Sequence, residues 1–211
     1  MENDIRIVAF IGPSGTGKSH RAQMVAKSKN ISYIIDDAIL IHDNRVIAGT
    51  SAKRASTKIE SVKRALFSFD GQAEEMKATI KEKKPDAILI LGTSDDMVDK
   101  IVKNLDLPPI SERVYIQDVS SPQEMELARS IRMSEGKHVI PVPTFEIKKD
   151  FSGYLLDPLQ IFKWKGKGTT PFMTEKSIIR PTFSYLGKYI ISDNVLRSIV
   201  EYASKDIEGI Y

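Results

Sequence analysis

Residues 12–19 read Gly-Pro-Ser-Gly-Thr-Gly-Lys-Ser, a complete GxxxxGK[ST] pattern. Glycines in such a loop let the backbone N–H groups face phosphate oxygens, and the following helix contributes the positive end of its dipole. Lys18 is expected to reach the β- and γ-phosphates, and the Ser19 hydroxyl to ligate Mg²⁺. The pattern therefore predicts a nucleoside triphosphate site lined by Gly12, Pro13, Ser14, Gly15, Thr16, Gly17, Lys18, Ser19 and His20.

The segments on either side of this loop have the patterns of a strand and a helix, which phosphate binding by such a loop requires. Residues 5–11 form a short, mostly apolar run typical of a buried strand. Residues 19–28 carry apolar side chains at helical spacing. A strand, a glycine loop and a helix in this order are the context in which the pattern binds phosphate.

Two adjacent carboxylates, Asp36 and Asp37, close a second predicted strand over 31–36. The chain has room for only one helix between Lys18 and Asp36, so it must return at once to the sheet edge that holds the loop. A carboxylate there can hold the metal through water or accept a proton from an attacking hydroxyl. Asp36 or Asp37 is thus a catalytic candidate, and Asp36 also a metal candidate. The alternative is a solvated strand end, where Asp favours the turn.

Strands and helices are expected to alternate over the first two thirds of the chain. Further strands are predicted at 87–91, 113–117 and 138–142, and helices at 57–69, 72–83, 95–104 and 122–134. These elements predict a doubly wound, three-layer α/β fold with a mostly parallel five-stranded sheet over residues 1–143. Residues 144–176 are expected to be an irregular extension or linker. Residues 177–211 are expected to form a small C-terminal α+β appendage, with a strand pair over 177–191 and a helix from 193 to about 205.

The stretch from Ile7 to Ile41 resembles the small-metabolite and nucleoside kinases of the P-loop NTPase superfamily, especially the shikimate- and gluconate-kinase type. This resemblance implies that the Asp after the second strand touches substrate or metal. It also implies a lid whose arginines cover the transferring phosphates. Arginine suits this role because its charged planar fork binds phosphate oxygens bidentately. The lid candidates are Arg129, Arg132, Lys137 and His138, which could equally form a solvated basic helix end.

The chain also departs from that group. Asp95 or Asp96, after the third parallel strand, could serve as a metal carboxylate, or they could simply favour the first turn of a helix. No sugar- or shikimate-binding signature is present. The basic segment 45–64 occupies the acceptor region, where it could bind an anionic acceptor or form a plain charged helical face.

The tail from Gly187 to Tyr211 resembles the opening of an alkaline-shock-protein (envelope stress response) domain. The resemblance implies a bacterial, Gram-positive source and a protein partner for the tail. That domain normally continues further. Either the sequence is a piece of a longer one, or the tail is a fragment used for packing or dimerisation.

Composition sets few limits on function. The chain has 211 residues, a net charge of +3 and no cysteine, which excludes disulfides, thiolate metal sites and a cysteine nucleophile. No apolar run reaches the length of a membrane span, and the N-terminus lacks the pattern of a signal peptide. A cytoplasmic protein is expected.

Two functions follow from these features. The first is a Mg-ATP-dependent kinase that phosphorylates a small acceptor, with catalysis by positioning and charge. The second is a regulatory ATP-binding protein or slow ATPase whose nucleotide state controls a partner. A nucleic-acid-dependent ATPase is disfavoured, since the basic residues are not interleaved with aromatic ones. The absence of an Asn-Lys-x-Asp guanine signature favours adenine.

Overall fold

The computed structural model describes residues 5–142, 156–157 and 177–179, and these form an α/β fold around a six-stranded mixed sheet. The strand order is β4-β3-β2-β5-β1-β6. Four strands run parallel: β1 (Arg6–Ile11), β2 (Tyr33–Asp36), β5 (Ala87–Gly92) and β6 (Ile110–Tyr115). β3 (Ile39–His42) and β4 (Arg45–Gly49) extend the sheet antiparallel to β2.

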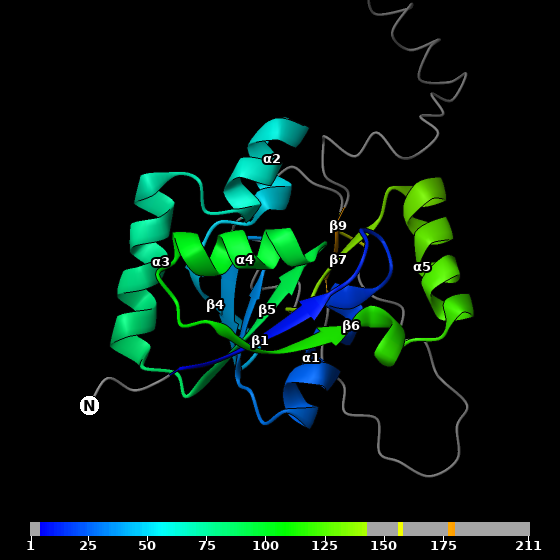
Figure 1. Cartoon of the computed structure of the whole chain (residues 1–211). Helices are drawn as coiled ribbons and strands as arrows, with labels where there is room; N and C mark the ends of the chain where they lie inside the picture. The colour runs from blue at the N-terminus through cyan, green and yellow to red at the C-terminus, as the bar shows by residue number, and fades with distance from the viewer. Residues whose placement is uncertain (1–4, 143–155, 158–176, 180–211) are drawn as a thin grey trace, which may run out of the picture.

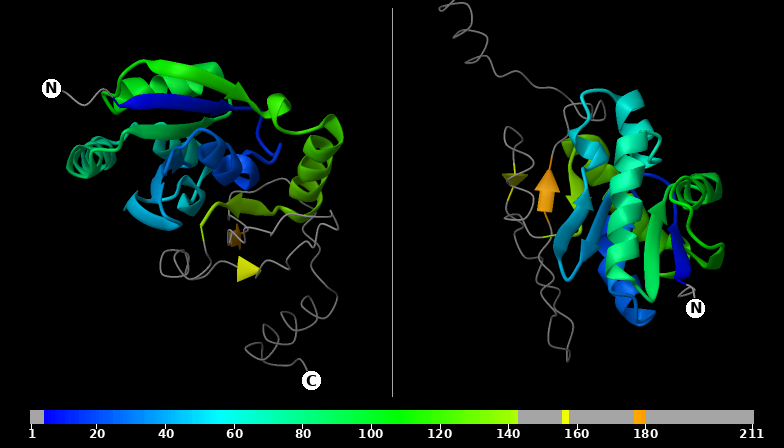
Figure 2. Two further views of the ribbon diagram at one scale, coloured as in Figure 1. Left: turned by 90° about the horizontal axis from the view of Figure 1, so that it is seen from below. Right: turned by 90° about the vertical axis from the view of Figure 1, so that its left-hand side faces the viewer.

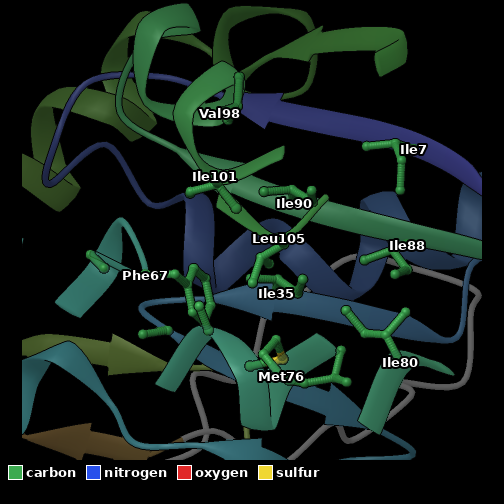
Figure 3. Packing of buried hydrophobic residues seen from close by; sticks show 14 of the residues in the cluster. Ile7, Ile35, Phe67, Met76, Ile80, Ile88, Ile90, Val98, Ile101 and Leu105 are labelled. Atoms are coloured by element: carbon green, nitrogen blue, oxygen red, sulfur yellow. The ribbon is translucent and has the colours of Figure 1, made fainter. Parts of the chain in front are cut away.

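Helices cover both faces of the main sheet (Figure 1). α1 (Lys18–Ser28) packs with alternate residues of β1, Val8 and Phe10, in one buried cluster. α3 (Asp70–Lys83) and α4 (Asp95–Asn104) cover the opposite face of the sheet. Their buried side chains form a second cluster with strand residues such as Ile7, and Figure 3 shows this cluster. The remaining helices are α2 (Lys58–Ala65), α5 (Pro122–Glu135) and the short 3₁₀ turns η1 (Ala52–Arg54) and η2 (Ile116–Asp118).

The chain leaves β1 and β5 in opposite directions. From β1 it passes through α1 to β2, whereas from the neighbouring β5 it passes through α4 to β6, on the far side of β1. Adjacent strands with diverging connections form a topological switch point, where open α/β sheets bind ligands. The loop at residues 12–17 therefore begins at the position in the sheet where a binding crevice is expected.

The predicted five-stranded sheet is wrong in two respects. The segment 138–142 was expected as its fifth strand, but β7 (His138–Ile140) pairs antiparallel with β9 (Ser177–Ile179), which also pairs with β8 (Leu156–Asp157). Figure 2 shows this small sheet on the α1 side of the main one. β7 lies there because Ile140 and Val142 join the α1 cluster.

The second error is the omission of the β3–β4 hairpin. Two tight turns build it, Asp37–Ala38 between β2 and β3 and Asp43–Asn44 between β3 and β4. All four residues have positive φ, the geometry of type I′ turns. This conformation normally needs glycine or asparagine, so the sequence did not signal the first turn. Segment 45–64 is consequently not one helical face, because it begins with β4 and η1.

The other predicted elements form with small changes at their ends. The predicted helices 57–69 and 72–83 are α2 and α3, and the predicted strand 113–117 is β6 followed by η2. α5 begins as expected, with Ser121 and Glu124 making a reciprocal capping box. Among the described residues, no helix is long and apolar enough to cross a membrane. The predicted boundary near 143, most of the irregular segment, and the tail helix lie outside the described residues. Of the predicted strand pair over 177–191, only Ser177–Ile179 is described, and it forms β9, which pairs with β7 and β8.

Gly49 allows the hairpin to close against the β2–β3 turn. Its φ is +85°, and a Cβ atom there would lie 2.2 Å from the Ala38 carbonyl oxygen. We expect Gly49→Ala to lower the free energy of unfolding by about 2 kcal/mol or more, because it adds left-handed strain and a backbone clash. The measurement is urea unfolding followed by circular dichroism.

Gly71 supplies the matched control for this substitution. It lies in α3 with open space around its Cβ position. Gly71→Ala should raise the free energy of unfolding by about 0.5 kcal/mol through helix propensity. Equal effects of the two substitutions would contradict the close approach at Gly49.

Candidate functional site

The glycine loop connects β1 to α1 at the carboxyl edge of the sheet. Its backbone begins with Gly12, whose N–H donates to the Gly92 carbonyl at the end of β5, 3.2 Å away. Gly17 caps α1 in the left-handed conformation, with φ 92°. The Thr16 hydroxyl donates to the Pro13 carbonyl at 2.8 Å. The loop is thus held to the neighbouring strand and also within itself.

Close neighbours explain two of the glycines. A Cβ on Gly12 would lie 2.4 Å from the Ile116 side chain in η2. Gly15 has φ +83°, and a Cβ there would lie 3.0 Å from Cδ of Arg132. On Gly17, the nearest atom would be the methyl group of Ala128. The neighbours of Gly15 and Gly17 place α5 beside the glycine loop, and Figure 1 shows the two segments near each other.

Lys18, the first residue of α1, folds back along the loop. Its Nζ donates to the carbonyl oxygens of Gly12 at 2.5 Å and Pro13 at 2.9 Å. Desolvation lowers its pKa to about 8, the charge of Asp36 opposes this shift, and Arg132 adds to it. Lys18 therefore shares one electrostatic environment with Asp36 and Arg132. Ser19 follows it, partly buried, whereas Pro13, Ser14 and His20 are exposed.

The two predicted carboxylates have different surroundings. Asp36, the last residue of β2, is buried, and its Oδ2 atom has no hydrogen-bond partner. Asp37, the next residue, forms an ion pair with Lys53. Because buried carboxylate oxygens normally find a donor, the Asp36 oxygen is the more unusual feature. It is the atom best suited to accept a proton or a metal.

Lys53 lies at this edge of the sheet too, although sequence reasoning did not single it out. It was one of several basic residues in the segment 45–64, yet its side chain is only 8% exposed. Desolvation lowers its pKa to about 8, with further charge effects from Asp36, Arg132 and Lys18. A charged lysine is seldom buried unless it is paired. Neither the residue type nor its position in the sequence predicts this burial, because it is the β3–β4 hairpin that brings Lys53 to the carboxyl edge of the sheet.

The predicted lid residues divide into two groups. Arg132 is half-buried beside Gly15, and burial lowers its pKa. Arg129 is exposed and pairs with Glu126 on its own helix at 3.3 Å, although its Cα lies on the loop side. His138 lies buried in β7, where desolvation lowers its pKa to about 2 and keeps the imidazole neutral. Lys137 precedes it and is partly buried. Of these four residues, Arg132 is the one that both packs beside Gly15 and affects the pKa of Lys18.

Asp95 and Asp96 lie in the first turn of α4. Asp95 accepts hydrogen bonds from Arg113 at 2.9 Å and from the Tyr115 hydroxyl at 3.2 Å. Asp96 is exposed. The helix-turn interpretation accounts for the position of both residues. The metal role of Asp95 stays a prediction.

α5 is attached to α1 by an ion pair between Arg21 and Glu124, and Glu124 also closes the capping box with Ser121. The Ser121 backbone N–H and the charge of Arg21 both lower the pKa of Glu124. The start of α5 is therefore fixed to the helix that follows the glycine loop.

Comparisons with protein-family models, with curated proteins and with solved structures found no significant match. The site must therefore be interpreted from its own geometry.

The buried ammonium of Lys53 should make stability depend on pH. Its pKa is lowered from 10.5 to about 8, so between these values the unfolded chain binds more protons than the folded protein. The penalty is fully present below about pH 8 and is relieved as the pH rises toward 10.5. The free energy of unfolding of the wild type, relative to Lys53→Met, should rise between about pH 7.5 and about pH 9.5.

Urea unfolding of both proteins at the two pH values measures this difference. The comparison between them cancels the titration of other lysines and tyrosines. Parallel stability profiles would show that Lys53 is not buried in charged form.

Proposed function

We propose that this protein binds a Mg²⁺-nucleoside triphosphate, most simply ATP, and transfers its terminal phosphoryl group to a small acceptor. The observation that carries the proposal is the grouping of Lys18, Arg132 and Asp36 at the carboxyl edge of the sheet. Phosphoryl transfer requires cations around the transferring group and a carboxylate near the attacking hydroxyl. The finer fold assignment, a P-loop NTPase fold, belongs to the same proposal and rests on the glycine loop at the switch point.

In this proposal the loop and Lys18 hold the phosphates. The acceptor oxygen attacks the terminal phosphorus while the bond to the bridging β-phosphate oxygen breaks, which releases ADP. The acceptor's proton passes to Oδ2 of Asp36, the buried oxygen without a partner. Arg132, beside Gly15, is placed to neutralise charge on the transferring group.

The residues present also fit a magnesium ion. No group of three or more His, Cys, Asp or Glu side chains forms a metal site within the described part of the chain. Mg²⁺ in nucleotide sites needs no such group, because phosphates and waters supply most of its ligands. The Ser19 hydroxyl and, through water, Asp36 are the side chains that would hold it. The ion would neutralise phosphate charge.

A second candidate function, a regulatory nucleotide switch, is favoured by one observation. The acceptor side of the site is partly filled by the protein itself, because Lys53 and Asp37 pair there and Lys53 is buried. Such an enclosed site suits slow hydrolysis or binding alone. A partner for the C-terminal tail would belong to this function.

Lys18→Ala tests nucleotide binding, which both functions require. We expect it to weaken Mg-ATP binding by about 10- to 100-fold, since it removes charge-assisted hydrogen bonds to phosphate. Isothermal titration calorimetry measures the affinity. Lys81→Ala, an exposed lysine on α3, is the control and should bind normally. Near-normal affinity in Lys18→Ala would refute the assignment of the loop.

Acceptor-dependent turnover, measured in the wild type and in Asp36→Asn, distinguishes the kinase from the switch. ADP release is measured with Mg-ATP and a panel of small hydroxyl metabolites, each added separately. We expect at least one acceptor to stimulate turnover in the wild type, and Asp36→Asn to lower that turnover by about 100-fold or more, a larger loss than any change in Mg-ATP affinity. Turnover that is indifferent to every acceptor would favour the switch.

A further inference from the structure

Lys53 is a buried cation that the glycine-loop pattern does not include. Its side chain is 8% exposed, and it comes from η1 rather than from the loop or from α5. After desolvation, the charges of Asp36, Arg132 and Lys18 act on its pKa, so these four groups lie at the same edge of the sheet. Burial of a fourth charged group at this edge has an energetic cost, so its presence calls for an explanation.

The β3–β4 hairpin and η1 hold Lys53 in this position. The Ala52 N–H donates to the Asp37 carbonyl at 2.8 Å, which fixes the start of η1 to the β2–β3 turn. The buried Ser51 hydroxyl accepts from the Lys53 N–H at 3.2 Å. Asp37 and Ala38 adopt left-handed backbone conformations in the turn itself, which are costly for residues other than glycine. These two hydrogen bonds and the constrained turn therefore fix the backbone position of Lys53.

The charges in this cluster do not cancel. Within the described part of the chain, the cluster contains three cationic side chains, Lys18, Lys53 and Arg132, and two carboxylates, Asp36 and Asp37. His138 is neutral. Among these described groups one positive charge is left over at a partly desolvated place, an arrangement that favours an anion.

We propose that Lys53 binds the terminal phosphate of the bound nucleoside triphosphate, so that the hairpin distinguishes a triphosphate from a diphosphate. This inference rests on the proposed nucleotide site. The terminal phosphate is the fitting ligand because Lys18, which approaches the β- and γ-phosphates in such loops, shares its electrostatic environment with Lys53.

Asp37 makes the exchange of partners feasible. Its carboxylate is 28% exposed, whereas Lys53 is 8% exposed. When the ammonium turns to phosphate, the Asp37 carboxylate can be hydrated without moving into the interior. The Lys53–Asp37 ion pair thus stands in for the phosphate contact in the absence of nucleotide, and Asp37 competes with the phosphate for the same cation.

The test compares the affinity for a non-hydrolysable β,γ-imido ATP analogue with that for ADP, both with Mg²⁺, by isothermal titration calorimetry. Lys53→Met removes the charge and keeps most of the apolar stem. We expect the ratio of the two affinities to fall about tenfold or more, with ADP affinity changed less than about twofold. Lys58→Met, an exposed lysine at the start of α2, is the matched control and should leave the ratio unchanged.

Asp37→Asn provides an opposite-sign test that does not depend on the folding of Lys53→Met. Removing the competing carboxylate should raise the ratio in favour of the triphosphate analogue. The inference is overturned if Asp37→Asn leaves the ratio unchanged, if Lys53→Met weakens both nucleotides equally, or if it affects only acceptor-dependent turnover. The last result would assign Lys53 to an anionic acceptor.

Failure of this inference can be distinguished from failure of the proposed function. If the wild type binds neither nucleotide, or if Lys18→Ala binds both normally, the nucleotide site itself is wrong. If Lys18→Ala weakens both nucleotides and Lys53→Met leaves their ratio intact, the site stands and only the role of Lys53 falls.

Discussion

Two lysine ammonium groups and one guanidinium group lie at the carboxyl edge of the sheet, where each is at least partly desolvated. Asp36, the last residue of β2, and Asp37, the residue after it, offset two of these three positive charges. β2 ends at Asp36, and the chain turns there at once. The β2–β3 turn, the antiparallel hairpin and η1 together bring Lys53 to Asp37.

Much of the central fold could be predicted because its signals are local. β1 and β5 read as apolar runs, and they are buried on both faces of the sheet. The start of α5 was visible in its capping residue, Ser121, whose side chain accepts the Glu124 backbone N–H. The glycine loop was equally visible, since each of its fixed positions is a residue type with few substitutes.

The hairpin and Lys53 could not be predicted for the opposite reason. Turns with two left-handed residues are normally marked by glycine, but Asp37 and Ala38 take this conformation here under constraint from the surrounding packing. The burial of Lys53 depends on the pairing of β3 with β2, which sequence spacing does not reveal. The Arg132 contact was expected only through a family resemblance, whereas the structure supports it through the space beside Gly15.

The ion pair between Arg21 and Glu124 fixes the start of α5 to α1. Arg132 lies eight residues beyond Glu124, which corresponds to about 12 Å along a helix. The same helix that is fixed to α1 at its start therefore carries the guanidinium beside Gly15, so the length of α5 sets where this charge lies relative to the glycine loop.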